Sequence, residues 1–331
     1  MARSNSVRNG ILIAICVQNA ASTLLRRYSA QTETVSSKEL LLTSEIVKLT
    51  ICIVLIFQSS EPSEHKFSTG YGRLIFLLQN CKAMWVLAAI YAAMNLLSFV
   101  SLNFISAGEF TIMAQLKILT TAYCSHLFIG TYISSAKWRA LLLIVIGCVL
   151  VMSPGFVFET TPGNPVVAEQ APADKKKAAD IIFWGYGAVG LEVVLSGCSS
   201  IYFEKIVKST SSDVSIWERN FQLSSISIFI FGCTSLYDRS TLAAAPVKIE
   251  PHLFIFSLLS WSVIVSMSIG GLLVAATLKY ADSIMKTLAT SASIVISTLM
   301  GFLLLSGPMN LSVICGAVIT IIAIFNYTFD E

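Results

Sequence analysis

The stretch QLKILTTA (residues 115–122) and the stretch IMKTLATS (residues 284–291) each place a lysine in apolar surroundings, about half a chain apart. Both read Lys-x-Leu-x-Thr followed by a small residue. A lysine inside a bilayer costs about 3 kcal/mol or more, so such residues are rare and usually functional. Two of them in matching surroundings, Lys117 and Lys286, predict a membrane protein with an internal repeat and a site for an anion.

The composition is that of an integral membrane protein, with 55% apolar and only 12% charged residues. Soluble domains carry about 25% charged residues. No charged residue lies between Lys286 and Asp330, a run interrupted by Gly307-Pro308 and long enough for two spans of about 20 residues each. The sequence therefore predicts an all-α integral membrane protein.

Several function classes are excluded by what the sequence lacks. The net charge of +3 is too small to indicate a nucleic-acid partner. The eight cysteines are scattered singly, without the spacing of metal ligands, so no metal or other cofactor is expected. The chain shows no nucleotide-hydrolysing loop, no metalloprotease motif and no nucleophile elbow, so we expect a secondary active transporter rather than an enzyme.

The hydrophobic pattern predicts ten transmembrane helices, over residues 9–29, 38–58, 83–105, 109–131, 136–155, 179–207, 215–236, 252–279, 282–305 and 308–328. A short interfacial stretch is expected over 72–82. The longest polar interruption, 158–178, is predicted to be a linker between a first five-helix repeat (1–157) and a second one (179–331). Because each half has an odd number of spans, the second half should insert upside down, which describes two inverted repeats.

Other polar residues inside the predicted spans have two interpretations each. Glu45 and Lys48 share one helical face, as a structural ion pair or with Lys48 turned towards a substrate. Asn95 fits an interhelical bond or a contact with a base or ribose. The pair Gly270-Gly271 permits close helix packing or close approach of a ligand. Glu192 is a further polar residue at mid-span.

A phosphate or diphosphate is the natural counter-ion for two convergent ammonium groups. Thr121 and Thr290 follow Lys117 and Lys286 by one turn and add hydroxyl donors. For each lysine the alternative is a structural role.

At this level the chain resembles the nucleotide-sugar transporter family, within the drug/metabolite transporter superfamily. The resemblance extends over nearly the whole chain in family order. It is carried by SEIVKL (44–49), QLKILTTA (115–122), YFEK (202–205) with SIWERNFQL (215–223), and KYADSIMK (279–286). Phe110 and Ala114 depart from the pattern, because relatives commonly carry tyrosines at these positions.

The resemblance implies ten helices with cytosolic termini in the Golgi membrane, with the endoplasmic reticulum as the alternative. It implies exchange of a cytosolic nucleotide sugar for a lumenal nucleoside monophosphate, and it leaves a homodimer open. The substrate-binding positions carried over are Lys48, Asn95, Lys117, Ser196, Asn220 and Lys286. Supporting candidates are Tyr91, Phe110, Thr121, Tyr202, Gly270, Gly271 and Thr290.

For the substrate, residues 116–122 and 289–294 look like the UDP-sugar branch, whose members carry UDP-galactose or UDP-N-acetylglucosamine. Carriers of CMP-sialic acid are the first alternative. A different drug/metabolite-type carrier is a more distant one, and the buried lysines argue against cations as its cargo. A membrane scaffold without transport would have no use for polar groups at mid-membrane depth.

Overall fold

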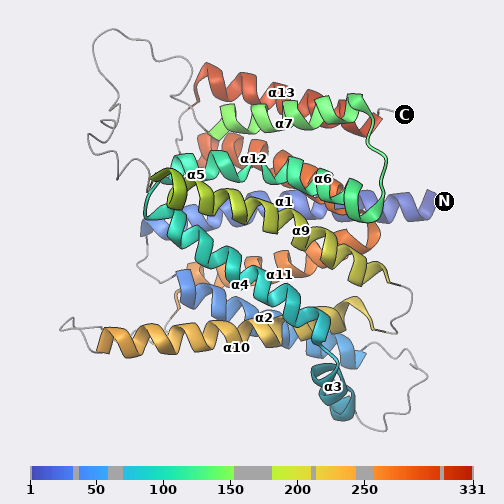
Figure 1. The fold of residues 1–331 in the computed structure, drawn as a ribbon, viewed down its shortest axis with the longest axis vertical. Helices are drawn as coiled ribbons and strands as arrows, with labels where there is room; N and C mark the ends of the chain where they lie inside the picture. Colours follow the sequence, from blue (N-terminus) through green and yellow to red (C-terminus); the bar gives the residue numbers. More distant parts are fainter. Residues whose placement is uncertain are drawn as a thin grey trace. The chain divides into compact units, whose positions relative to one another are not determined.

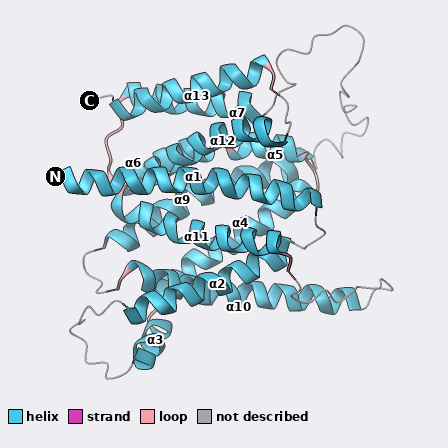
Figure 2. Ribbon diagram, turned by 180° about the vertical axis from the view of Figure 1, so that it is seen from behind, coloured by secondary structure: helices cyan, strands magenta, loops and turns pink. Residues whose placement is uncertain are grey.

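The computed structural model describes residues 2–32, 37–58, 70–152, 181–209, 214–243, 256–305 and 309–329. Every regular element in these ranges is helical (Figures 1 and 2). The elements are α1 (Ala2–Thr32), α2 (Ser37–Gln58), α3 (Gly70–Gln79), α4 (Lys82–Leu102), α5 (Ala107–Ala114), α6 (Lys117–Ile129), α7 (Ser135–Met152), the π-helix η1 (Ile181–Tyr186), α9 (Gly187–Lys208), α10 (Ile216–Ala243), α11 (Leu258–Tyr280), α12 (Ser283–Leu305) and α13 (Leu311–Phe329).

All ten predicted spans overlap helical chain, and the predicted interfacial stretch overlaps α3. Within the described residues, eight spans are long and apolar enough to cross a membrane, and they include α5 and α6 together as one span. The all-α, multi-pass membrane class is therefore confirmed. The helices on the other two spans, α1 and α10, are long but more polar, so ten crossings stay a prediction. The predicted linker 158–178 lies outside the described residues.

The span predicted over 109–131 is interrupted, because α5 ends at Ala114 and α6 begins at Lys117. At the break the backbone N–H of Gln115 donates to Ile112 O (3.1 Å), one residue short of the α-helical acceptor. The Gln115 side chain takes up that acceptor instead, with Nε2 3.4 Å from Thr111 O. The Gln115 side chain thus donates to the Thr111 carbonyl in place of the backbone N–H that would bond to it in a regular α-helix. This replacement explains how an apolar span tolerates the break.

The chain forms two compact units, each with segments from both predicted halves. Unit 1 comprises residues 1–89 and 204–282, and unit 2 comprises residues 90–203 and 283–331. Two inverted five-helix repeats, with boundaries at 157 and 179, stay a prediction. The units are described separately below.

In unit 1, α11 packs against α1 and α2, and α2 also packs against α10. The short helix α3 is fastened to the start of α10 by polar contacts. Arg73 donates from Nε to the buried carboxylate of Glu218 (2.5 Å), and Gln222 donates from Nε2 to Leu77 O (2.8 Å). The carboxylate of Glu218 in α10 thus pairs with a guanidinium of α3, and the amide of Gln222 bonds to a carbonyl near the end of α3.

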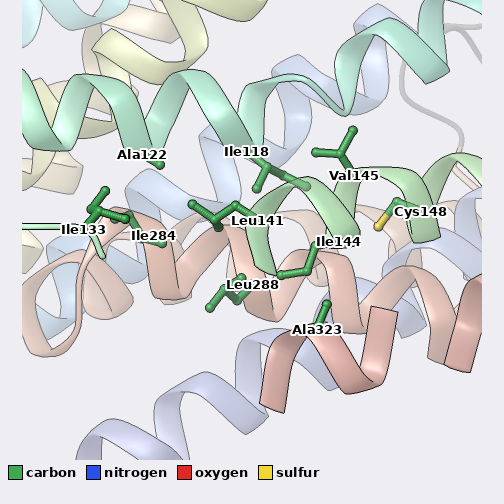
Figure 3. Packing of buried hydrophobic residues seen from close by; sticks show 10 residues of the cluster. All are labelled: Ile118, Ala122, Ile133, Leu141, Ile144, Val145, Cys148, Ile284, Leu288 and Ala323. Atoms are coloured by element: carbon green, nitrogen blue, oxygen red, sulfur yellow. The ribbon is translucent and has the colours of Figure 1, made fainter. Parts of the chain in front are cut away.

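In unit 2, α7 and α13 pack closely against each other where Gly147 of α7 faces Gly316 of α13. A Cβ on Gly147 would lie 2.9 Å from Gly316 O, and a Cβ on Gly316 would lie 2.7 Å from Gly147 O. Small residues allow membrane helices to approach in this way. Next to this crossing lies an apolar cluster (Figure 3) made of Ile118, Ala122, Ile133, Leu141, Ile144, Val145, Cys148, Ile284, Leu288 and Ala323.

Candidate functional site

Lys117 is the first residue of α6, directly after the break in the span. Its side chain is partly buried and has neither a hydrogen bond nor a direct ion pair with the part of the chain that the structure describes. The backbone N–H groups of Ile118, Leu119 and Thr120 are bonded to the carbonyls of residues 115 and 116, so the charge at this position is that of the ammonium group. The position therefore suits an anion.

Lys286 lies in the first turn of α12 and is held by α9. Its Nζ donates a hydrogen bond to Ser200 Oγ (2.7 Å), and the carbonyl of Ser200 accepts one from Ser283 Oγ (3.1 Å). Lys286 therefore has a structural partner as well as a charge to offer.

The structure brings the two lysines into the same unit, on neighbouring helices. Ile118 of α6 and Ile284 and Leu288 of α12 belong to one apolar cluster (Figure 3), so α6 and α12 are packed together next to both lysines. The expectation that Lys117 and Lys286 face one cavity from opposite walls stays a prediction.

The hydroxyl-bearing candidates of unit 2 lie on the same three helices. Thr290 uses its hydroxyl within α12, donating to the carbonyl of Lys286 (3.0 Å). Thr121 is fully buried on α6, whereas Ser196 and Tyr202 are partly buried on α9. A role for any of them in binding would complement ammonium groups with neutral donors.

The candidates on α4 and α5 have different surroundings. Asn95 and Tyr91 are one turn apart on α4 and both are partly buried, so each keeps some accessible surface. Phe110 instead packs against an apolar cluster of Ile105, Val189 and Val193. At least part of the role of Phe110 is thus to fasten α5 to α9.

Lys48 lies in unit 1, where the ion pair predicted from its spacing is present. Its Nζ is 2.7 Å from Glu45 Oε1, and both side chains are largely buried. The side chain of Lys48 lies against α11 at Gly271, where a Cβ would lie 3.0 Å from Lys48 Cδ. A contact of Lys48 with substrate stays a prediction.

Gly270 serves the packing of α1 on α11. A Cβ at this position would lie 2.6 Å from Gln18 Nε2, which donates to Ser266 O (2.7 Å). The two glycines thus make room for polar side chains of α1 and α2, which supports the helix-packing interpretation.

Asn220 is 1% exposed in the first turns of α10, and its Nδ2 donates to Ile216 O of the same helix (3.0 Å). One of the two N–H groups of its amide therefore bonds to the backbone of its own helix. Asn220, Lys48 and the two glycines lie in unit 1, and the other candidates lie in unit 2.

Sequence reasoning missed two partners in unit 2. Ser200 was not predicted as the partner of Lys286, and nothing in the spacing could reveal a contact between α9 and α12. Glu192 was noted only as a polar residue, whereas its Oε2 accepts a hydrogen bond from Ser98 Oγ of α4 (2.9 Å). The signal was present, since a carboxylate inside a span needs a compensating group.

Comparisons with known proteins show which family the chain belongs to. The family model described as nucleotide-sugar transporter matches residues 3–328. The UDP-galactose/UDP-N-acetylglucosamine transporter srf-3 of Caenorhabditis elegans is 31% identical, over 98% of this chain and 83% of that protein. The UDP-N-acetylglucosamine/UDP-N-acetylgalactosamine transporter nstp-4 of the same organism is 30% identical, over 99% and 96%.

A solved crystal structure resembles the chain with a TM-score of 0.68 at 14% identity, over 98% of this chain and 97% of that one. This likeness concerns the fold alone. The family model and the relatives together cover almost every residue, so the chain belongs to the nucleotide-sugar transporter family.

Proposed function

We propose that this protein exchanges a UDP-sugar, UDP-galactose or UDP-N-acetylglucosamine, for UMP across a Golgi or endoplasmic reticulum membrane. The observation that carries the proposal is the pair of lysines, Lys117 and Lys286, on packed helices of one unit inside membrane spans. Two such charges are costly in a bilayer and mark a candidate site for an anionic ligand. The names of the relatives supply the ligand class, UDP-sugars.

In this proposal each lysine makes a charge-assisted hydrogen bond to a phosphate oxygen. Lys117 contributes from the start of α6, directly after the break in the span, and substrate sites in other carriers lie at such broken membrane helices. Asn95 on α4 is accessible enough to contact the uracil or ribose, with Tyr91 beside it. Lys48, Ser196, Asn220, Tyr202, Thr121 and Thr290 complete the proposed set, with Gly270, Gly271 and Phe110 in support.

We further propose that the chain crosses the membrane ten times as two inverted repeats with cytosolic termini. The support is that every predicted span overlaps a helix and that the lysine motif occurs once in each half. Because no ATP-hydrolysing motif occurs in the sequence, uptake should be driven by the counter-substrate. The oligomeric state, monomer or homodimer, does not enter the proposal.

The test is uptake of labelled nucleotide sugars by liposomes containing the purified protein. Labelled UDP-galactose or UDP-N-acetylglucosamine should enter UMP-loaded liposomes much faster than empty ones, without ATP. Equal rates with and without internal UMP would refute exchange. Faster uptake of CMP-sialic acid into CMP-loaded liposomes would replace the UDP-sugar assignment.

A further inference from the structure

Glu192 is a carboxylate within the membrane span that contains α9, and the proposed exchange does not use it. A carboxylate at this depth is unfavourable unless another group compensates its charge. Ser98 of α4 supplies one neutral hydrogen bond to Oε2 (2.9 Å) and also bonds to its own helix at Met94 O (3.0 Å). One shared hydroxyl is a weak counterpart for a full negative charge.

Helix α6, which begins at Lys117, touches α9 next to Glu192. Thr120 Oγ1 donates to the carbonyl of Val193 (3.0 Å). A Cβ at Gly197 would lie 2.9 Å from the carbonyl carbon of Thr120, so the two backbones are in contact. Lys117 is one turn before Thr120, and Glu192 precedes Val193.

The charges of Lys117 and Glu192 therefore act on each other without a direct ion pair. The absence of a direct ion pair between Lys117 and Glu192 matters, because a lysine held in such a pair would have to break that pair before binding a ligand. An ammonium group that is compensated but not bonded can donate directly to a phosphate oxygen. The same carboxylate repels that phosphate, since like charges in a low-dielectric site interact strongly.

We infer that Glu192 is an internal counter-ion of Lys117 that competes with the ligand's phosphate groups and so sets how tightly nucleotides are held. In the empty carrier, Glu192 keeps Lys117 compensated. In the loaded carrier, it weakens the hold on phosphate and speeds release. The compensation of Lys117 does not depend on the proposed function, whereas the competition with the ligand's phosphate groups rests on it.

The first experiment measures nucleotide binding to the purified full-length protein. Glu192→Gln keeps an oxygen for Ser98 and removes the charge. It should tighten UMP binding about tenfold, equivalent to about 1.4 kcal/mol, tighten UDP binding more, and leave binding of uncharged uridine unchanged. Glu109→Gln is the matched control, because Glu109 bonds Tyr186 (2.6 Å) in the same unit and should leave all three affinities unchanged. Unchanged UMP affinity in Glu192→Gln, or an equal change for uridine, would overturn the inference.

The second experiment needs no nucleotide and decides the charge pair by itself. Thermal unfolding is compared for Lys117→Gln, Glu192→Gln and the double variant. Removing one charge of a partly buried pair inside membrane spans should destabilise more than removing both. Lys117→Gln should therefore lower the unfolding temperature less in the Glu192→Gln background than in the wild type. Additive shifts would refute the pairing.

The two experiments also separate the inference from the proposed function. A wild-type protein that binds no uridine nucleotide would refute the UDP-sugar proposal, while the thermal cycle would still decide the pairing. If Glu192→Gln does not fold, the double variant should fold where the single one fails. Failure of both would show that Glu192 is needed for a reason unrelated to Lys117 and would overturn the inference.

Discussion

Replacing Lys117 by alanine tests the proposed phosphate site most cleanly. Its ammonium group makes no hydrogen bond or ion pair within the described ranges, so the substitution breaks no bond of the fold there. Lys286 is a poorer choice, because its replacement also strands the Ser200 hydroxyl that it now contacts at 2.7 Å.

The expected effect follows from one lost charge-assisted hydrogen bond to phosphate. Such bonds contribute about 1.5–3 kcal/mol, and the desolvated setting favours the upper part of this range. A loss of about 2–3 kcal/mol weakens UMP binding roughly 30- to 150-fold. The unfolding temperature should fall by only a few degrees. The substitution removes a charge that compensates Glu192, but it breaks no hydrogen bond or direct ion pair of that carboxylate.

The assay pairs UMP titration with thermal unfolding of the same purified sample. Lys137→Ala is the matched control, since Lys137 lies at the start of α7, 6.0 Å from the ring centre of Tyr327, and should keep wild-type affinity. Unchanged UMP affinity of Lys117→Ala would refute the phosphate assignment. A collapse of the unfolding temperature would assign Lys117 a structural role instead.

Three further outcomes concern contacts within each unit. Gly147→Ala should lower stability by about 1–3 kcal/mol, because its Cβ would meet the backbone of α13 at 2.9 Å, whereas Gly190→Ala meets nothing within 4 Å and should unfold like wild type. Arg73→Ala should cost about 3 kcal/mol by stranding the buried carboxylate of α10, and an unfolding temperature equal to wild type would contradict this. Mild oxidation should cross-link Cys124 to Cys198, whose sulfur atoms are 3.5 Å apart, and mass spectrometry finding both thiols free would disprove the contact.

Much of the fold could be predicted from the sequence, because membrane helices show their limits in composition alone. The run without charge after Lys286 gave α12 and α13, and the spacing of Glu45 and Lys48 gave their ion pair. These features depend on a single helix and its solvent. Local sequence is sufficient for them.

The remainder depends on contacts between distant segments. The break at Gln115 needs a side chain to replace a backbone donor, and apolar periodicity does not reveal it. The partners Ser200 for Lys286 and Ser98 for Glu192 lie on other helices. For the candidate site, the lysines were recognised from the free-energy cost of a charge in a bilayer, whereas their neighbours on other helices could be identified only from the structure.

Each unit contains segments from both the N-terminal and the C-terminal half of the chain, and this has a consequence for biogenesis. When the first half leaves the ribosome, α2 lacks its neighbours α10 and α11, and α7 lacks α13. The face of α7 that carries Gly147 lacks its partner α13 until the last helix is inserted. Nascent chains must therefore hold unfinished helices in the membrane until synthesis ends, and a premature stop before residue 311 leaves unit 2 without the helix that covers α7.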